Sequence, residues 1–160
     1  MTEIIFPQNK QNVKGCLLVV TYYGFKQPIR TACQNFSDCS DWIVVEFPMF
    51  RYRNDVYDKK ENYADLFCTA VFQTKPDAIL FWYNNLTQLE MQLLRDKIDP
   101  KIPFLIFNWD DPHMWYDSHS HLPSIAKYFD GALTSSRVCV QRYLDSSASN
   151  EDRRKVYPQF

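Results

Sequence analysis

Two carboxylates and a histidine follow an apolar run at residues 102–107 of this chain. Asp110, Asp111 and His113 come directly after Asn108 and Trp109. Such side chains can bind a divalent cation, contact a polar ligand or transfer a proton. Three neighbouring groups on one loop rarely complete a metal coordination shell, so we favour a polar ligand contact over a metal. The structural alternative is that an aspartate caps the following turn, whose shape Pro112 fixes.

The elements that must position these groups are strands and helices in alternation. Apolar runs predict buried strands, and Gly, Pro and helical spacing mark the segments between them. The predicted strands are residues 16–21, 42–47, 77–83, 102–107 and 129–134. The predicted helices are residues 28–36, 61–73, 87–98, 122–128 and 137–144. This order predicts an α/β fold, a Rossmann-like parallel sheet of about five strands with helices on both faces.

Organisation along the chain predicts one Rossmann-like N-terminal lobe over residues 1–145. Residues 146–160 are polar at first and then begin to resemble another strand, so we expect a linker or the start of a missing segment. The chain is then the first lobe of a longer protein. At the carboxyl end of each parallel strand a ligand can bind in the crevice beyond the sheet.

One helix has a clear start. Thr87 is its predicted N-cap, which also gives Asn85-Leu86-Thr87 a simpler meaning than a glycosylation sequon. Leu89, Leu93 and Leu94 are expected on its apolar side. The residues expected to face water are Glu90, Gln92 and Arg95.

Composition excludes several classes of function. A net charge of -1 gives no reason to expect nucleic acid or an anionic membrane as partner. No apolar run approaches the ~20 residues that span a bilayer, so we expect no membrane span and a cytoplasmic location. The chain has only three glycines and no G-x-G-x-x-G or Walker A motif, so we expect no nucleotide cofactor.

The cysteines give no sign of a nucleophile, whereas the aromatic residues are compatible with a sugar-binding surface. The five cysteines, which form no C-x-x-C pair and have no identifiable base, are Cys16, Cys33, Cys39, Cys68 and Cys139. A cysteine nucleophile is therefore not expected. Aromatic residues make up 16% of the chain, and Tyr22, Trp82, Tyr83 and Trp109 fall at predicted strand ends. Packing explains most of them, but aromatic faces beside carboxylates also suit sugars.

The order of three motifs resembles the N-terminal region of CgeB-like, spore-maturation-type glycosyltransferases of the GT-B fold. Pro76-Asp77 precedes an apolar strand, Asp110-Asp111-Pro112 follows another, and Phe129-Asp130 opens a third that ends in Thr134 and Ser135. The resemblance covers residues 75–144.

The resemblance implies two facing Rossmann-like lobes, of which this chain supplies the one that shapes the acceptor side. A sugar or glycan acceptor would bind here, and the nucleotide-sugar donor would bind through a missing C-terminal lobe. Asp110, Asp111 and His113 would face the cleft between lobes, with a catalytic base among them and no metal needed. The residues implied to line the cleft are Gly24, Thr134, Ser135 and Ser136.

Two other functions stay open. A stand-alone Rossmann-like binding or protein-interaction module fits the missing phosphate loop and the missing catalytic constellation. A small metal-dependent hydrolase would use Asp110, Asp111 and His113. The glycosyltransferase lobe is our preferred hypothesis, with little or no transferase activity by itself.

Overall fold

The chain has an α/β fold with a mostly parallel sheet, consistent with the predicted Rossmann-like architecture. A computed structural model describes residues 3–8, 12–21, 27–49, 63–82, 86–108, 125–134 and 155–158. The strand order is β1-β3-β2-β4-β5-β6-β7. The five predicted strands correspond to β2–β6, and the short strands β1 and β7 are additions. The chain divides into two compact units, Met1–Leu80 and Phe81–Phe160, which are described in turn.

The first unit is built around two parallel strands. β2 (Gly15–Thr21) pairs in register with β3 (Trp42–Pro48), so that Val19 lies opposite Glu46 and Thr21 opposite Pro48. β1 (Ile4–Ile5) pairs antiparallel with the other edge of β3. β1 has only two residues, too few to produce the alternating or apolar pattern by which a strand is recognised in a sequence.

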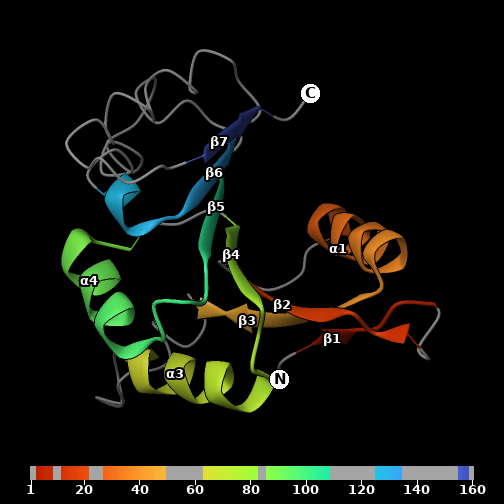
Figure 1. The fold of residues 1–160 in the computed structure, drawn as a ribbon, viewed down its shortest axis with the longest axis horizontal. Coiled ribbons are helices and arrows are strands. Elements are labelled where there is room, and N and C mark those ends of the chain that lie inside the picture. The colour runs from red at the N-terminus through yellow and green to blue at the C-terminus, as the bar shows by residue number, and fades with distance from the viewer. Residues whose placement is uncertain are drawn as a thin grey trace. The chain divides into compact units, whose positions relative to one another are not determined.

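Two helices cover the opposite faces of this sheet (Figure 1). α1 (Gln27–Ser40) buries Cys33 and Ser37, while α3 (Tyr63–Thr74) buries Ala64, Phe67 and Val71. The rings of Phe47 and Phe67 meet edge to face with centroids 5.2 Å apart, which fixes α3 on its side of β3.

Helix α1 is longer than the predicted segment 28–36 and ends only at Ser40. Its last turn is rich in residues of modest helix propensity, which is why the sequence indicates an earlier end. Ser37 is fully buried, and its hydroxyl donates to the carbonyl of Trp42 at 2.6 Å. Asp41, with a φ of 61°, then stops the helix in the left-handed conformation. Tertiary contacts have therefore extended the helix beyond its local preference.

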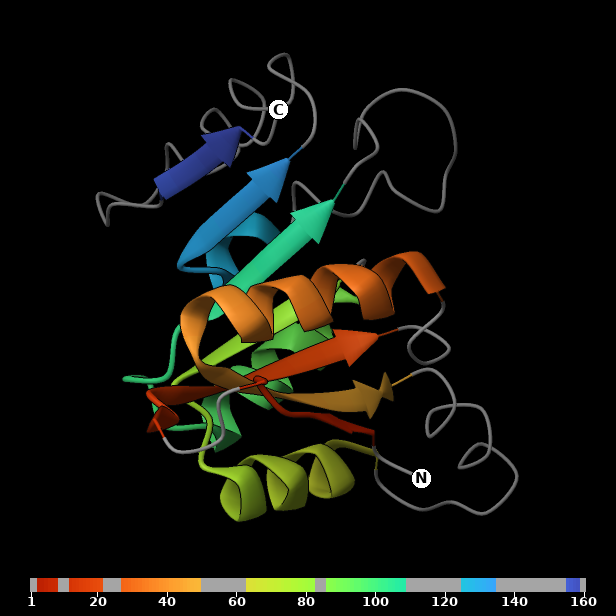
Figure 2. The same cartoon turned by 90° about the vertical axis from the view of Figure 1, so that its right-hand side faces the viewer.

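Strand β4 (Ala78–Trp82) crosses the boundary between the units, and the second unit continues with a parallel sheet. β5 (Phe104–Asn108) pairs with β6 (Gly131–Thr134), which pairs with β7 (Lys155–Pro158). Figure 2 shows the arrows of β5 and β6 side by side and pointing the same way. In the sequence, β5 and β6 are separated by a short 3-10 helix, η2 (Ala126–Tyr128). It falls within the segment where the sequence predicts a helix at 122–128. The predicted helix at 137–144 lies outside the described residues.

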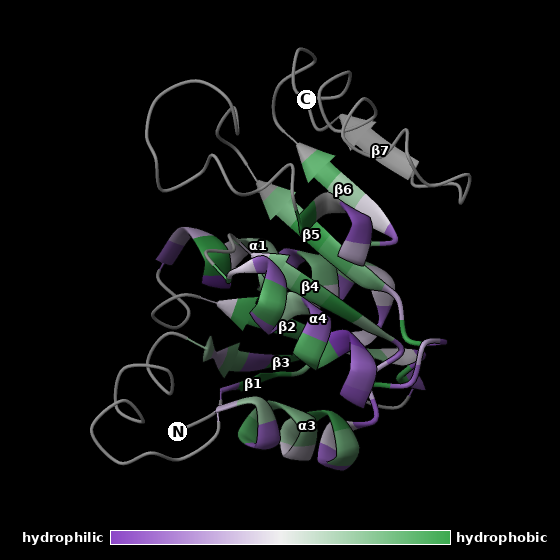
Figure 3. Cartoon of the chain, turned by 90° about the vertical axis from the view of Figure 1, so that its left-hand side faces the viewer, coloured by the Kyte–Doolittle hydropathy of each residue, from purple (hydrophilic) through white to green (hydrophobic). Residues whose placement is uncertain are grey.

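Aromatic side chains alternate between the two faces of this second sheet. Phe81 packs against Phe104 and Phe129 with ring centroids 5.3 and 5.4 Å away. Trp82 directly follows Phe81, and Phe107 lies three residues after Phe104, so the strand alternation places both on the opposite face. There they pack against each other. In Figure 3 the strands β5 and β6 are coloured mainly as hydrophobic, as expected for strands with a buried face.

Helix α4 (Gln88–Lys97) confirms some predictions and corrects others. Thr87 is its N-cap in a complete capping box with Glu90. Leu94 is buried as predicted, together with Met91, but Leu89 and Leu93 are 79% and 38% exposed. Arg95, expected in water, retains only 17% of its side-chain exposure. Leucines fall on both sides of this short helix, so their spacing alone does not identify the buried face.

Among the described residues, no helix is long and apolar enough to cross a membrane.

Candidate functional site

The carboxyl ends of β5 and β6 lie side by side. Asn108 and Thr134, the last residues of the two strands, are partners in the parallel register. The segment that carries Asp110, Asp111 and His113 starts one residue after Asn108, and Ser135 and Ser136 follow Thr134 directly. Two of the predicted polar segments therefore leave the sheet from neighbouring strand ends, where open parallel sheets bind ligands.

Most of the predicted site residues fall outside the described part of the chain. These residues are Gly24, Asp110, Asp111, His113, Ser135 and Ser136. Thr134 is described only as the end of β6. The predicted roles of these residues stay predictions. Within the described ranges, no group of three His, Cys, Asp or Glu side chains is arranged to hold a metal ion.

An aromatic pair lies near the same strand ends in the second unit. Trp82 is the last residue of β4, and Phe107 is the residue before the end of β5. Their ring centroids are 4.6 Å apart at an interplanar angle of 55°. Both side chains are half-buried, so part of each aromatic surface stays accessible. A half-exposed aromatic surface of this kind can stack on the apolar face of a sugar ring.

In the first unit, the carboxyl ends of β2 and β3 carry a buried polar pair. The hydroxyl of Thr21 donates to Glu46 Oε1 at 3.0 Å. Thr21 and Glu46 are 1% and 4% exposed. Burial, and secondly the charge of Glu46, raises the pKa of the nearby Cys33 thiol to about 12. Sequence reasoning missed the Thr21–Glu46 pair, because one glutamate in an apolar run does not reveal which residue it contacts.

Two cysteines can be assessed as nucleophiles. Burial, with a smaller contribution from Asp77, raises the pKa of Cys16 to about 11. Cys33 is shifted further, as described above. Both of these thiols are therefore protonated at neutral pH and are poor nucleophiles.

The amino ends of the strands are closed by a repeated arrangement, which we call the aspartate bracket. Asp77, just before β4, donates its backbone N–H to the Cys16 carbonyl and accepts from the Cys16 N–H through its carboxylate, both at 2.8 Å. Asp130, just before β6, makes the same two contacts with Phe104, at 2.8 and 2.7 Å. Each bracket lies within one unit. These aspartates belong to the motifs that carry the family resemblance, and here they join strands.

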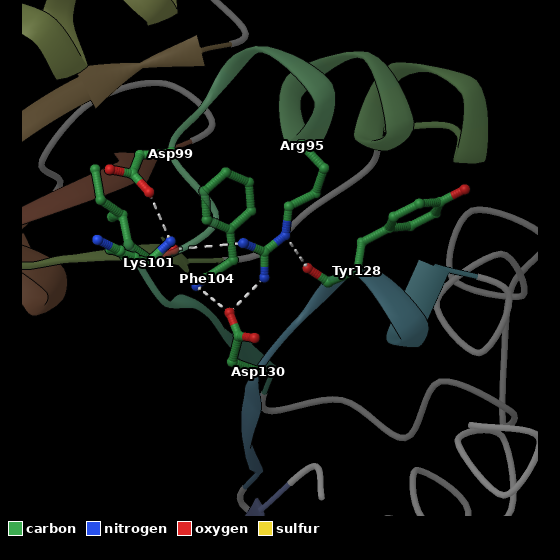
Figure 4. Close-up of polar contacts among 7 residues, drawn as sticks. Arg95, Asp99, Lys101, Phe104, Tyr128 and Asp130 are labelled. Atoms are coloured by element: carbon green, nitrogen blue, oxygen red, sulfur yellow. Dashed lines mark hydrogen bonds and ion pairs between the residues drawn. The ribbon is translucent and has the colours of Figure 1, made fainter. Parts of the chain in front are cut away.

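The bracket of the second unit has an additional partner in Arg95 (Figure 4). The Arg95 guanidinium forms an ion pair with Asp130, donates from Nε to the Tyr128 carbonyl at 2.7 Å, and from Nη1 to the Ile102 carbonyl at 3.4 Å. It also lies 4.0 Å from the centroid of the Phe104 ring. Every acceptor in this network is used to join α4 to the starts of β5 and β6, so its role is structural.

No protein-family model and no curated protein matches this chain.

Proposed function

We propose that this chain is the acceptor-side lobe of a glycosyltransferase that transfers a sugar from a nucleotide-sugar donor. The observation that supports this most is the half-buried Trp82–Phe107 pair. It lies near the strand ends from which the chain continues to Asp110 and Asp111. An apolar stacking surface followed by carboxylates matches the two chemical sides of a sugar, its apolar face and its hydroxyl groups.

In this proposal the acceptor stacks on the Trp82 indole, and its hydroxyl groups donate to Asp110 or Asp111. One of Asp110, Asp111 and His113 takes the proton of the attacking hydroxyl as general base, which makes the oxygen a better nucleophile. A second lobe binds the donor, so the chain alone has little or no transferase activity. The proposed location is the cytoplasm, where nucleotide sugars are available to the donor lobe.

The test is an NMR titration of the purified chain with a panel of glycans and, separately, with nucleotide sugars. We expect glycans to shift the Trp82 indole signal and the amide signals of Asn108 and Thr134. The amides of Phe104 and Asp130, at the amino ends of the same strands, should not move. Nucleotide sugars alone should shift none of these signals.

Two substitutions sharpen this test. Trp82→Ala should weaken glycan affinity about fivefold to tenfold, whereas Trp82→Phe should keep most of it. Asp110→Asn with Asp111→Asn should also weaken binding. The matched control is Asp96→Asn on α4, where the carboxylate contacts only Gln92 among the contacts described. If no glycan binds, or if the control weakens binding equally, the proposal is wrong.

A stand-alone interaction module is the second candidate, and the outer surface of α4 favours it. Leu89 and Leu93 lie one helical turn apart and are 79% and 38% exposed. Exposed apolar side chains in such a row can bind a partner protein. If a protein partner binds while no glycan does, and Leu89→Gln abolishes that binding, this candidate replaces the first.

A further inference from the structure

Residues 3–8 of the first unit are held at the outer edge of the sheet by more than a strand ladder. β1 has only two ladder residues, Ile4 and Ile5, which pair with Val45 and Val44 of β3. Three polar side chains of α1 also contact this segment, and their spacing of four residues places them on one face of the helix. We call these side chains the polar row: Arg30, Gln34 and Asp38.

The polar row contacts the segment mainly through its backbone. In the order of the row, its partners are the Glu3 carboxylate at 2.7 Å, the Phe6 carbonyl at 3.3 Å and the Gln8 backbone N–H at 2.9 Å. Only the first of these contacts depends on the type of side chain in the segment. The polar row therefore fits any extended backbone that carries an acidic residue at the position of Glu3.

The segment is held by few contacts that bury apolar surface. Ile5 and Pro7 are buried, but Ile4 and Phe6 are 50% and 45% exposed. Arg30 keeps 55% of its side-chain exposure, and exposed ion pairs add little to stability. Because a segment with few buried contacts opens before the rest of its unit unfolds, we expect residues 3–8 to leave the edge while β2 and β3 stay paired.

Release of the segment leaves an edge of β3 that can pair with another strand. β1 forms its ladder with only two of the seven residues of β3, and one further bond joins the Glu46 N–H to the Glu3 carbonyl at 2.9 Å. A longer antiparallel strand can form more ladder bonds with this edge. Strand edges of this kind bind extended peptides by adding a strand to the sheet.

We propose that the outer edge of β3 and the polar row form a binding site for an extended peptide of a partner protein, and that residues 3–8 fill this site in the free chain. The peptide lies antiparallel to β3. It carries an acidic residue that pairs with Arg30 and, two positions later, an aliphatic residue that takes the buried place of Ile5. The segment is thus an internal competitor of the partner. The proposal does not depend on glycan binding.

The test uses the full chain and a fluorescent peptide with the sequence of residues 1–8. Ile5→Asp places a charge at a buried position of the segment and releases it, while β3 and the polar row keep their sequence. We expect the peptide to bind this variant at least about tenfold more tightly than wild type, because the tethered segment of wild type competes for the site. Binding is measured by fluorescence anisotropy. Equal affinity for both chains, or binding to neither, overturns the inference.

Two further variants keep the test decisive if Ile5→Asp does not fold. Glu3→Arg reverses the charge of a side chain that is 31% exposed, and it should raise peptide affinity about threefold. Phe72→Asp, the control, places a charge at an exposed position of α3 and should leave affinity as in wild type. If Glu3→Arg leaves affinity unchanged, or if Phe72→Asp raises it as much, release of the segment does not control binding and the inference is overturned.

Changes on both sides of the ion pair test the acidic position of the peptide. On whichever released variant folds, a peptide with Glu3→Gln should bind about threefold more weakly than the original peptide. After Arg30→Met in the same chain, the two peptides should bind equally, because the cation that distinguishes them is gone. If the difference between the peptides persists without Arg30, the assigned pattern is wrong.

Sedimentation distinguishes a partner protein from a second copy of this chain. The released variant should stay monomeric without peptide and bind one peptide per chain. If wild type instead forms a dimer that the peptide dissociates, the site takes residues 3–8 of a second copy, and the assignment to a partner protein is overturned.

Discussion

The two aspartate brackets make the same two backbone hydrogen bonds but differ in their other contacts. In each unit an aspartate before a strand bonds both backbone groups of one residue on a neighbouring strand, Cys16 in the first unit and Phe104 in the second. In a parallel ladder the N–H of that residue would bond a backbone carbonyl, and the carboxylate replaces it. In the second unit the carbonyl of Tyr128, two residues before Asp130, accepts a hydrogen bond from Arg95.

The two brackets differ in whether a cation contacts the aspartate and in how closely other residues pack beside it. Asp130 accepts from a cationic guanidinium as well as from a backbone N–H. Asp77 has no cation in its described contacts, but it lies close to Gly15 and Trp42. A Cβ built on Gly15 would lie 2.9 Å from Asp77 Oδ2 and 2.9 Å from Trp42 Cε2. The first bracket therefore depends on close packing, and the second depends on an ion pair.

Replacing the arginine should have the largest effect. Arg95→Met keeps most of the aliphatic packing but removes the hydrogen bonds to Tyr128 and Ile102 and the ion pair with Asp130. We expect the free energy of unfolding to fall by about 3 kcal/mol, measured by urea denaturation. Lys127→Met, which removes an exposed cation beside the Tyr128 ring, is the control and should cost less than ~1 kcal/mol. Equal losses would show that Arg95 adds no more than a surface contact.

The same substitution at both aspartates should separate the two brackets. Asparagine keeps an oxygen that can accept from a backbone N–H but has no negative charge. Asp77→Asn should therefore change the free energy of unfolding by no more than ~0.5 kcal/mol, while Asp130→Asn should cost about 1–2 kcal/mol. Denaturation of the two variants under identical conditions measures this gap. Equal effects would mean that charge does not distinguish the brackets.

Close packing around Gly15 should matter for the stability of the first bracket only. Gly15→Ala forces the Asp77 carboxylate or the Trp42 ring to move, because the new Cβ would lie 2.9 Å from each. We expect a loss of about 1 kcal/mol in unfolding free energy. Trp42→Leu in the same chain should relieve part of this loss, as a double-mutant cycle would show. Simple additivity of the two changes would contradict the packing explanation.

Salt should have the smallest effect, and only on the second bracket. The Arg95 and Asp130 side chains are 17% and 51% exposed, so the ion pair is partly screened by dissolved ions. Raising NaCl to about 1 M should narrow the gap between Asp130→Asn and Asp77→Asn by roughly 0.5 kcal/mol. A gap that widens with salt would contradict an electrostatic origin.

Local sequence patterns were sufficient where the interactions that form an element all lie within one segment of the chain. The apolar runs of β2 and β3 locate buried strands because a strand covered on both faces needs apolar residues throughout. The apolar run of β5 locates a strand in which buried Phe104 and Ile106 alternate with half-buried Leu105 and Phe107. Thr87 and Glu90 locate the start of α4 because a capping box is closed within four consecutive residues. The segment after Asn108 was predicted as a site from the abrupt change from apolar to polar residues at a strand end, and its role stays a prediction.

Contacts between distant residues were beyond these signals. Leu89 and Leu94 are equally apolar, yet only Leu94 is buried, because the sheet and not the helix decides which face is covered. Arg95 is typical of a solvated helix face, but residues 33 and 35 positions away in the chain supply its partners.

The sequence alone determined the α/β alternation, the strand cores and the helix cap, since each depends on neighbours within a few residues. Only the tertiary structure decided that Asp77 and Asp130 join strands, that Trp82 packs on Phe107, and that Thr21 pairs with Glu46. The reason is physical: a hydrogen bond or a ring contact between strands depends on register and facing, and these are set by packing across the whole unit.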